Sequence, residues 1–180
     1  ELGARGFATR FFAGRRTGGD LIPRPRGRMR DARQQLVIGH YDTVWPVGTL
    51  RTMPFEYDGR HVRGPGVFDM KGGLAELAFA LRAIEALGLS MSVVPIVFLN
   101  SDEEIGSRES APHIARLARA ADRALILEPS LGPAGALKTA RKGVGRYTIT
   151  VKGRAAHAGL DPERGVSAIL ELSYVIQKLF

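Results

Sequence analysis

Three short apolar runs, separated by segments of helical periodicity, limit what this 180-residue chain can fold into more than any other feature. The runs cover residues 35–39, 93–99 and 124–127, and the segments with helical periodicity cover residues 72–87 and 110–121. Strands that are apolar at every position are buried on both faces, as happens when helices cover both sides of a parallel sheet. The sequence therefore predicts an α/β domain with a mostly parallel central sheet.

The rest of the chain predicts a hairpin and a second, smaller domain. Asp58-Gly59 lies between two short strand-like segments, which is typical of a tight hairpin turn. From Gly145 on, apolar and polar residues alternate as in a strand with one wet face, and residues 167–180 have helical periodicity. We place a domain boundary near Lys142-Gly143. The main domain then covers residues 1–142, and the start of a smaller α+β domain covers residues 143–180.

Both ends of the chain have the pattern of interrupted elements. The first residue is Glu1 rather than Met, and residues 1–7 read as the end of a helix that passes through Gly6 into a strand. The last predicted helix ends without a capping glycine. We expect this chain to be part of a longer one, so the absence of a signal peptide carries no information.

Composition excludes several classes of site and protein. The chain has no cysteine, which excludes disulfides and thiolate nucleophiles and leaves His, Asp and Glu to hold any metal. No window approaches the roughly 18 consecutive apolar residues of a membrane span, so we expect no membrane partner. A cysteine-free protein suits the cytoplasm, which is the expected location.

The net charge of +8 is concentrated near the N-terminus, where residues 1–33 contain nine Arg and three acids. Prolines and a glycine separate several of these arginines, namely Arg24, Arg26, Arg28 and Arg30. Arginines that bind nucleic acid are expected on one helix face or among aromatic residues. We interpret this stretch as a solvated loop and expect no nucleic-acid partner. A basic nucleic-acid module stays open as an alternative.

Each of the three apolar runs is followed directly by polar residues, most of them acidic. These are His40 and Asp42 after the first run, Asp102, Glu103 and Glu104 after the second, and Glu128 after the third. A further acid, Asp69, lies in a glycine-rich loop that opens the helix predicted at residues 72–87. In open α/β sheets, ligands bind beyond the carboxyl ends of the strands. We therefore expect these side chains to meet at one edge of the sheet.

The residue types at this edge suit a divalent metal. A histidine two positions before an aspartate, as in His40 and Asp42, offers one ring nitrogen to a metal while the carboxylate orients the other. The adjacent acids Glu103 and Glu104 repel each other unless a cation or a proton lies between them. Each motif by itself is more typical of capping or surface residues than of a metal site. Together, one imidazole and several carboxylates favour a pair of zinc, cobalt or manganese ions.

Four ordered motifs resemble those of a family of di-zinc metallopeptidases. The motifs are Gly39-His40-Tyr41-Asp42-Thr43-Val44-Trp45-Pro46, Gly64-Pro65-Gly66-Val67-Phe68-Asp69-Met70-Lys71-Gly72-Gly73, Asn100-Ser101-Asp102-Glu103-Glu104-Ile105-Gly106-Ser107 and Ala156-His157-Ala158-Gly159. The family includes aminoacylase, carboxypeptidase G, acetylornithine deacetylase and succinyl-diaminopimelate desuccinylase, and the glutamate carboxypeptidase branch is the most similar. The resemblance implies a three-layer zinc-peptidase-like catalytic domain and a small inserted dimerisation or lid domain.

The resemblance also implies a metal centre with two zinc ions. Asp69 would bridge the ions, His40 and Glu128 would complete the ligands of one zinc, and Glu104 would bind the other. The peptide bond between Asp69 and Met70 is a candidate for the family's unusual cis bond. The family takes its last metal-binding histidine and the residues that bind the substrate carboxylate from a more C-terminal part of the chain. We therefore expect the 180 residues alone to be inactive.

For catalysis, the resemblance implies that Glu103 is the general base and that Asp42 orients His40. His157 would reach the active site of a neighbouring subunit in a homodimer and bind the developing oxyanion. The reaction would be hydrolysis of an amide bond in a small peptide or an N-acyl-amino acid. A carboxypeptidase that releases glutamate is the leading hypothesis. An N-acyl-amino-acid deacylase and a non-catalytic binding relative are the alternatives.

Overall fold

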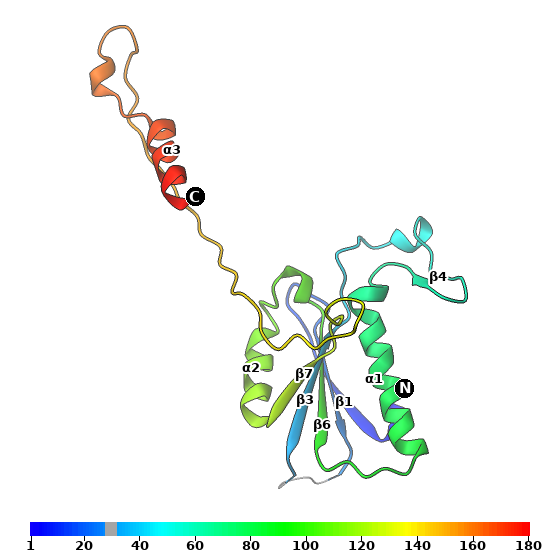
Figure 1. Ribbon diagram of the computed structural model, residues 1–180. Coiled ribbons are helices and arrows are strands. Elements are labelled where there is room, and N and C mark those ends of the chain that lie inside the picture. The colour runs from blue at the N-terminus through cyan, green and yellow to red at the C-terminus, as the bar shows by residue number, and fades with distance from the viewer. Residues whose placement is uncertain (28–31) are drawn as a thin grey trace. The chain divides into compact units, whose positions relative to one another are not determined.

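The computed structural model describes residues 1–27 and 32–180 (Figure 1). It divides the chain into two units, Glu1–Leu137 and Lys138–Phe180. Each unit is described by itself below. Arg28 and Arg30, which belong to the predicted solvated loop, lie outside the described residues.

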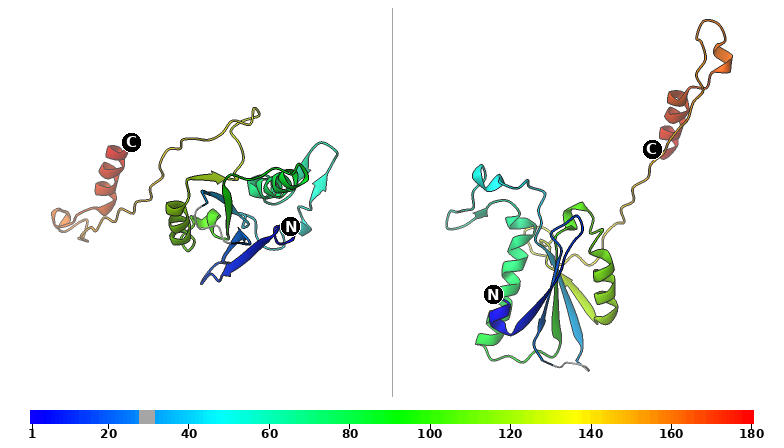
Figure 2. Two further views of the ribbon diagram at one scale, coloured as in Figure 1. Left: turned by 90° about the horizontal axis from the view of Figure 1, so that it is seen from below. Right: turned by 180° about the vertical axis from the view of Figure 1, so that it is seen from behind.

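The first unit is built on a five-stranded sheet with the strand order β1-β2-β6-β3-β7. The three predicted apolar strands are present as β3 (Gln34–His40), β6 (Val94–Asn100) and β7 (Arg123–Ile126). The expected burial on both faces is wrong for β7, an edge strand whose residues are all exposed. Both β6 and β7 pair with β3 in parallel, so β3 lies between them (Figure 2). The carboxyl ends of these strands therefore meet at one edge of the sheet.

The other edge of the sheet is a hairpin of β1 (Phe7–Phe12) and β2 (Asp20–Pro25). Because β2 is antiparallel to both β1 and β6, four of the five strands run in the same direction and only β2 is reversed. The predicted solvated loop is wrong for residues 20–25. Arg24 and Arg26 are exposed as expected, but the buried side chain of Ile22 joins the core and draws this segment into the sheet.

Two helices cover the two faces of the sheet, which confirms the predicted three layers (Figure 1). On β3, the side chain of Leu36 packs on the side of α2 (Ala111–Ala120), whereas Val37 packs on the side of α1 (Gly72–Ala86). Leu36 is 0% exposed and Val37 is 3% exposed. Burial on both faces explains why this strand is apolar at successive positions.

Short elements connect these layers. They are the 3-10 helices η1 (Gly3–Arg5), η2 (Thr49–Arg51) and η4 (Glu103–Ile105), the predicted hairpin of β4 (Glu56–Tyr57) and β5 (Val62–Arg63), and the π-helical segment η3 (Val67–Lys71). The chain leaves η1 through Gly6, which is left-handed, and enters β1, as the sequence predicts. The peptide bond between Asp69 and Met70 is cis, as the resemblance implied.

The second unit contains the 3-10 helix η5 (Pro162–Arg164) and the helix α3 (Ala168–Leu179). The hydroxyl of Ser167 caps α3 by accepting a hydrogen bond from the N–H of Leu170. The predicted strand around Tyr147, Ile149 and Val151 is wrong, because these residues have no regular structure. A strand needs a neighbour for its backbone N–H and C=O groups, and the pairing in this unit is limited to a bridge between Arg154 and Val166. Within the described residues, no helix has the length and apolar character that crossing a membrane requires.

Candidate metal centre

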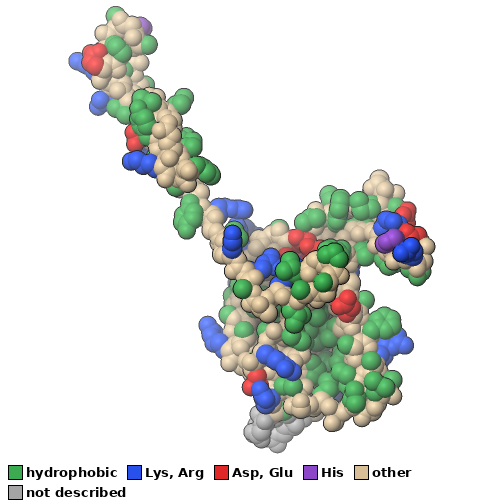
Figure 3. Space-filling view, viewed as in Figure 1, with side chains coloured by type: hydrophobic (Ala, Val, Ile, Leu, Met, Phe, Trp, Pro, Cys, Tyr) green, Lys and Arg blue, Asp and Glu red, His purple; other side chains and the backbone are tan. Residues whose placement is uncertain are grey.

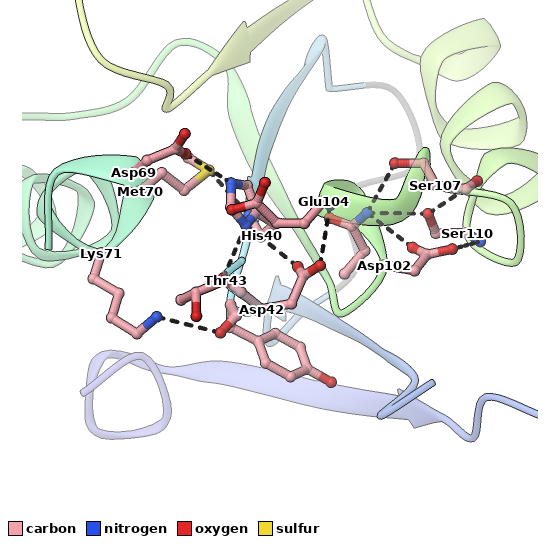
Figure 4. A network of polar contacts seen from close by, with 12 residues as sticks. His40, Asp42, Thr43, Asp69, Met70, Lys71, Asp102, Glu104, Ser107 and Ser110 are labelled. Carbon is pink, nitrogen blue, oxygen red and sulfur yellow. Dashed lines mark hydrogen bonds and ion pairs between the residues drawn. The ribbon is translucent and has the colours of Figure 1, made fainter. Parts of the chain in front are cut away.

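Three potential metal ligands converge at the carboxyl edge of the sheet. Two of them, His40 and Asp69, are labelled in Figure 4. His40 is the last residue of β3 and is only 1% exposed. Its Nε2 lies 3.1 Å from Oδ1 of Asp69 and 3.5 Å from Oε1 of Glu128. Asp69 comes from η3 and Glu128 follows β7. One ligand atom from each of the three residues lies within 4.8 Å of the others.

The surroundings of His40 fix the orientation of its ring. Nδ1 lies 3.3 Å from Oδ1 of Asp42 and 3.2 Å from the backbone oxygen of Asp42. Both of these atoms are acceptors, so they favour the tautomer with its proton on Nδ1. The lone pair of Nε2 then faces Asp69 and Glu128, as a metal ligand requires. The N–H of His40 donates to Sδ of Met70 at 3.1 Å, which anchors the end of the strand.

The charges at this edge raise several pKa values. Burial lowers the pKa of His40, but the hydrogen bond with Asp69 and the charges of Asp42 and Glu128 outweigh it and raise the pKa above its ordinary value. Burial raises the pKa of Glu128, and the nearby charge of Asp69 raises it further. A cation bound here would neutralise part of this excess negative charge. The donor set of one imidazole nitrogen and carboxylate oxygens therefore fits zinc, cobalt or manganese.

Glu103 and Glu104 lie on η4, between β6 and α2. Desolvation of its carboxyl raises the pKa of Glu103, and the charges of Glu104 and Asp69 add to this. Glu104 is tied to the centre through its backbone, because its N–H donates to Oδ2 of Asp42 at 3.1 Å. Among the described residues, the group of close ligand atoms consists of His40, Asp69 and Glu128 without Glu104. The role of Glu104 as a ligand stays a prediction.

Sequence reasoning missed a buried polar network directly behind η4. Asp102 is 1% exposed, and its Oδ2 accepts from the N–H groups of Glu109 at 2.8 Å and Ser110 at 3.2 Å. Nδ2 of Asn100 donates to Oδ1 of Asp102 at 3.1 Å and to the hydroxyl of Ser110 at 3.1 Å (Figure 4). Burial raises the pKa of Asp102, but these hydrogen bonds outweigh it and hold the pKa below its usual range. The one available signal was an acid placed shortly before a predicted helix.

His157 belongs to the second unit, where it is exposed. Its N–H donates to Oδ1 of Asp161 at 3.2 Å, and its Nδ1 accepts from the N–H of Gly159 at 3.1 Å. These contacts hold the backbone in a local turn, and neither of them uses Nε2 of the ring. The catalytic role of His157 stays a prediction.

A largely apolar pocket of about 860 Å³ lies beside the centre. Asp42 and Lys71 are its polar lining residues next to the ligands, and Trp45, Leu50 and Phe55 contribute apolar surface. Lys71 donates a hydrogen bond from Nζ to the backbone oxygen of Tyr41 at 3.4 Å, which places its charge between the pocket and the strand end. Figure 3 shows apolar side chains gathered on the surface of the first unit. The pocket is large enough for a small organic ligand.

A three-layer α/β fold with a His-Asp-Glu group at the carboxyl edge of its sheet defines a catalytic domain of the metallopeptidase type. The sequence profile of peptidase family M20/M25/M40 matches residues 36–174, and the chain belongs to this family. The resemblance found in the sequence is thereby confirmed.

Individual relatives agree with this assignment. The chain is 33% identical to carboxypeptidase G2 of a Pseudomonas species over 164 residues, which cover 91% of this chain and 39% of that protein. It is 36% identical to acetylornithine deacetylase of Salmonella arizonae over 140 residues, which cover 74% of this chain and 34% of that protein. The fold matches the crystal structure of aminopeptidase PepT from Bacillus cereus with a TM-score of 0.70 and 20% identity, over 98% of this chain and 48% of that chain. The chain thus spans between about a third and about half of the length of these relatives.

Proposed function

We propose that the protein containing this chain is a metal-dependent carboxypeptidase that hydrolyses the amide bond before a C-terminal amino acid, with glutamate as the released residue. The observation that carries this proposal is the convergence of His40, Asp69 and Glu128 within 4.8 Å, next to the turn that presents Glu103. The similarity to carboxypeptidase G2 supports the choice of reaction. The 36% identity to acetylornithine deacetylase favours an N-acyl-amino-acid deacylase as the second candidate.

The proposed centre holds two zinc ions, with cobalt or manganese as substitutes. His40, Glu128 and Asp69 would hold one ion, and Asp69 and Glu104 would hold the other. Bound ions of this kind acidify a water molecule and polarise the carbonyl of the substrate. The carboxylate of Asp42 keeps Nε2 of His40 available by holding the ring through Nδ1.

Glu103 acts as the general base in this proposal. Its raised pKa suits a carboxyl that takes a proton from the attacking water and passes it to the leaving nitrogen. The apolar pocket beside Asp42 binds the acyl side of the substrate, across the scissile amide from the released amino acid. His157 of the partner subunit in a homodimer donates a hydrogen bond to the developing oxyanion.

The proposed architecture assigns residues 1–142 to the catalytic domain and residues 143–180 to the start of an inserted dimerisation or lid domain. We further propose that the protein acts in the cytoplasm, on small substrates, without a nucleic-acid or membrane partner. The pairing of β2 within the sheet supports the exclusion of nucleic acid, because Arg24 lies on a strand and not on a free basic arm.

The deciding experiment compares the full-length protein with its Glu103→Ala variant. We expect the wild type to contain about two zinc ions and to release glutamate from N-acyl-glutamate substrates. The variant should keep its zinc and lose turnover by several orders of magnitude, because it lacks the proton acceptor. Glu76→Ala on the exposed face of α1 is the matched control and should retain full activity.

The same measurement separates the alternatives. Faster hydrolysis of N-acetylated basic amino acids than of glutamate conjugates would favour the deacylase. A wild type that binds no zinc and hydrolyses neither substrate would refute the proposal and favour a non-catalytic binding relative.

A further inference from the structure

The turn that carries Glu103 and Glu104 is held in place by its own backbone and by its two flanks. The N–H of Ser107 donates to the backbone oxygen of Asp102 at 2.6 Å, and the N–H of Gly106 donates to that of Glu103 at 2.8 Å. Gly106 has a φ of 92° and Ser107 a φ of 51°, so the chain reverses sharply here. A turn of this kind is compact, but its direction depends on what anchors it to the rest of the fold.

The flank facing α2 is anchored by the side chain of Asp102. This carboxylate is buried and accepts three hydrogen bonds, from Nδ2 of Asn100 and from the N–H groups of Glu109 and Ser110. Asn100 ends β6, and Ser110 directly precedes α2. Asp102 therefore joins the strand, the turn and the start of the helix at a single point.

The flank facing the metal ligands is anchored by Asp42. The carboxylate of Asp42 accepts from the N–H of Glu104 through Oδ2 and lies against Nδ1 of His40 through Oδ1. With Asp102 on one flank and Asp42 on the other, the backbone at residues 103–104 is fixed on both sides. The Cα–Cβ directions of Glu103 and Glu104 are thereby set relative to His40.

We propose that Asp102 is a positioning residue for the active site, which sets the placement of Glu103 and Glu104 without touching substrate or metal. This inference rests on the proposed function for the roles of these two glutamates. Residues that support metal ligands and catalytic groups from behind contribute about 10- to 100-fold to metal affinity or activity.

If Asp102 had a purely structural role, its replacement would affect stability in the same way as replacement of another buried carboxylate near α2. The chain contains such a carboxylate, which serves as a matched control. Asp20 is also a buried carboxylate that supports α2, since its Oδ2 lies 2.8 Å from Nδ1 of His113 on that helix. It contacts a side chain in the first turn of α2 and makes no hydrogen bond to the backbone of the turn at residues 102–107. If Asp102 only stabilised α2, Asp20→Asn and Asp102→Asn would have the same consequences.

The test uses the full-length protein and its two variants, with zinc titration by calorimetry and steady-state kinetics on N-acyl-glutamate. We expect both variants to lower the thermal midpoint. Only Asp102→Asn should weaken zinc binding by about 10- to 100-fold and lower kcat by a similar factor, with KM changed less. Equal losses in the two variants, or wild-type zinc affinity in Asp102→Asn, would overturn the inference.

Ser110→Ala covers the case in which Asp102→Asn does not fold. It deletes one hydroxyl from the same network, and a several-fold loss of zinc affinity and kcat is expected. Unchanged zinc affinity and kcat in a folded Ser110→Ala would overturn the inference. The zinc titration also separates the two proposals, because a wild type that binds zinc but hydrolyses no amide refutes the proposed function alone. A wild type that binds no zinc refutes both.

Discussion

The two carboxylate oxygens of Asp42 contact two different neighbours. Oδ1 lies 3.3 Å from Nδ1 of His40, and Oδ2 accepts from the N–H of Glu104 at 3.1 Å. The resemblance implied the first contact, whereas the second follows from the structure. A single carboxylate thus connects the ligand at the end of β3 with the turn after β6.

Replacing Asp42 by Asn should therefore damage the centre although the side chain keeps its shape. An amide has one oxygen, so its NH₂ group would face either the ring Nδ1–H of His40 or the backbone N–H of Glu104, and two donors would then face each other. We expect zinc binding about 10- to 100-fold weaker by calorimetric titration. Asp58→Asn, in the exposed β4–β5 hairpin, removes the same charge away from the centre and should titrate like the wild type. Wild-type affinity in Asp42→Asn would contradict the bridging role.

The ligands could be predicted from the sequence, whereas the support behind them could not. His40 and Glu128 follow apolar strands, and the order of strands and helices already places such residues at one sheet edge. Asp102 and Glu103 are adjacent acids of nearly the same chemistry. What separates them is burial, since Asp102 is buried between β6 and α2 whereas Glu103 is exposed on the turn. Burial of this kind depends on tertiary packing, which no local pattern encodes.

At the scale of elements, the sequence predicted the helices and strands whose own residues have a clear hydrophobic pattern. The strands β3 and β6 are apolar at successive positions because both of their faces are covered, and this pattern is visible in the sequence. The strand β2 was missed because its two prolines and Arg24 resemble a loop, and its pairing with β1 decides its conformation. The alternation at residues 147–151 predicted a strand, but alternation without a pairing partner is not enough to form one.

The β4–β5 hairpin contains a carboxylate whose titration should be visible. The backbone N–H groups of His61 and Arg60 and the side chain of Arg63 lower the pKa of Asp58 to about 2 from its ordinary value of 3.8. A carboxyl whose pKa is lower in the folded state stabilises that state at pH values above the pKa that the carboxyl has in the unfolded chain. The contribution of Asp58 to the hairpin is therefore complete above pH 3.8 and is lost as the pH falls through about 2.

Amide chemical shifts measured by NMR from about pH 5 down to about pH 1 test this expectation, because the range extends to both sides of the expected midpoint. The signals of Arg60 and His61 should move with a midpoint near 2, and Asp58→Asn should abolish this transition. The amide of Leu81, buried on α1, reports whether the whole fold unfolds over the same range. A midpoint near 3.8 for Arg60 and His61 would show that these hydrogen bonds do not form in solution.

At the scale of the whole chain, the candidate metal centre is contained in one of the two units. His40, Asp69, Glu104 and Glu128 all lie within Glu1–Leu137, whereas His157 lies in Lys138–Phe180. The candidate metal ligands in this chain therefore depend on the sheet and the two helices that pack on it. In the proposed function, the second unit bears on catalysis through His157 and through contacts between the subunits of a homodimer.

Limited digestion with trypsin should divide the chain according to this arrangement. Residues 138–146 are exposed, have no regular structure and contain four sites, at Lys138, Arg141, Lys142 and Arg146. Exposed segments of this kind are cut before ordered ones, so mass spectrometry should detect a first product that ends within residues 138–146. Because the ligands lie in the first unit, this product should bind zinc as tightly as the uncut chain. Replacing the four basic residues by Gln should remove the early cut. A first cut in the β4–β5 hairpin, or loss of zinc binding together with the second unit, would contradict this division of roles.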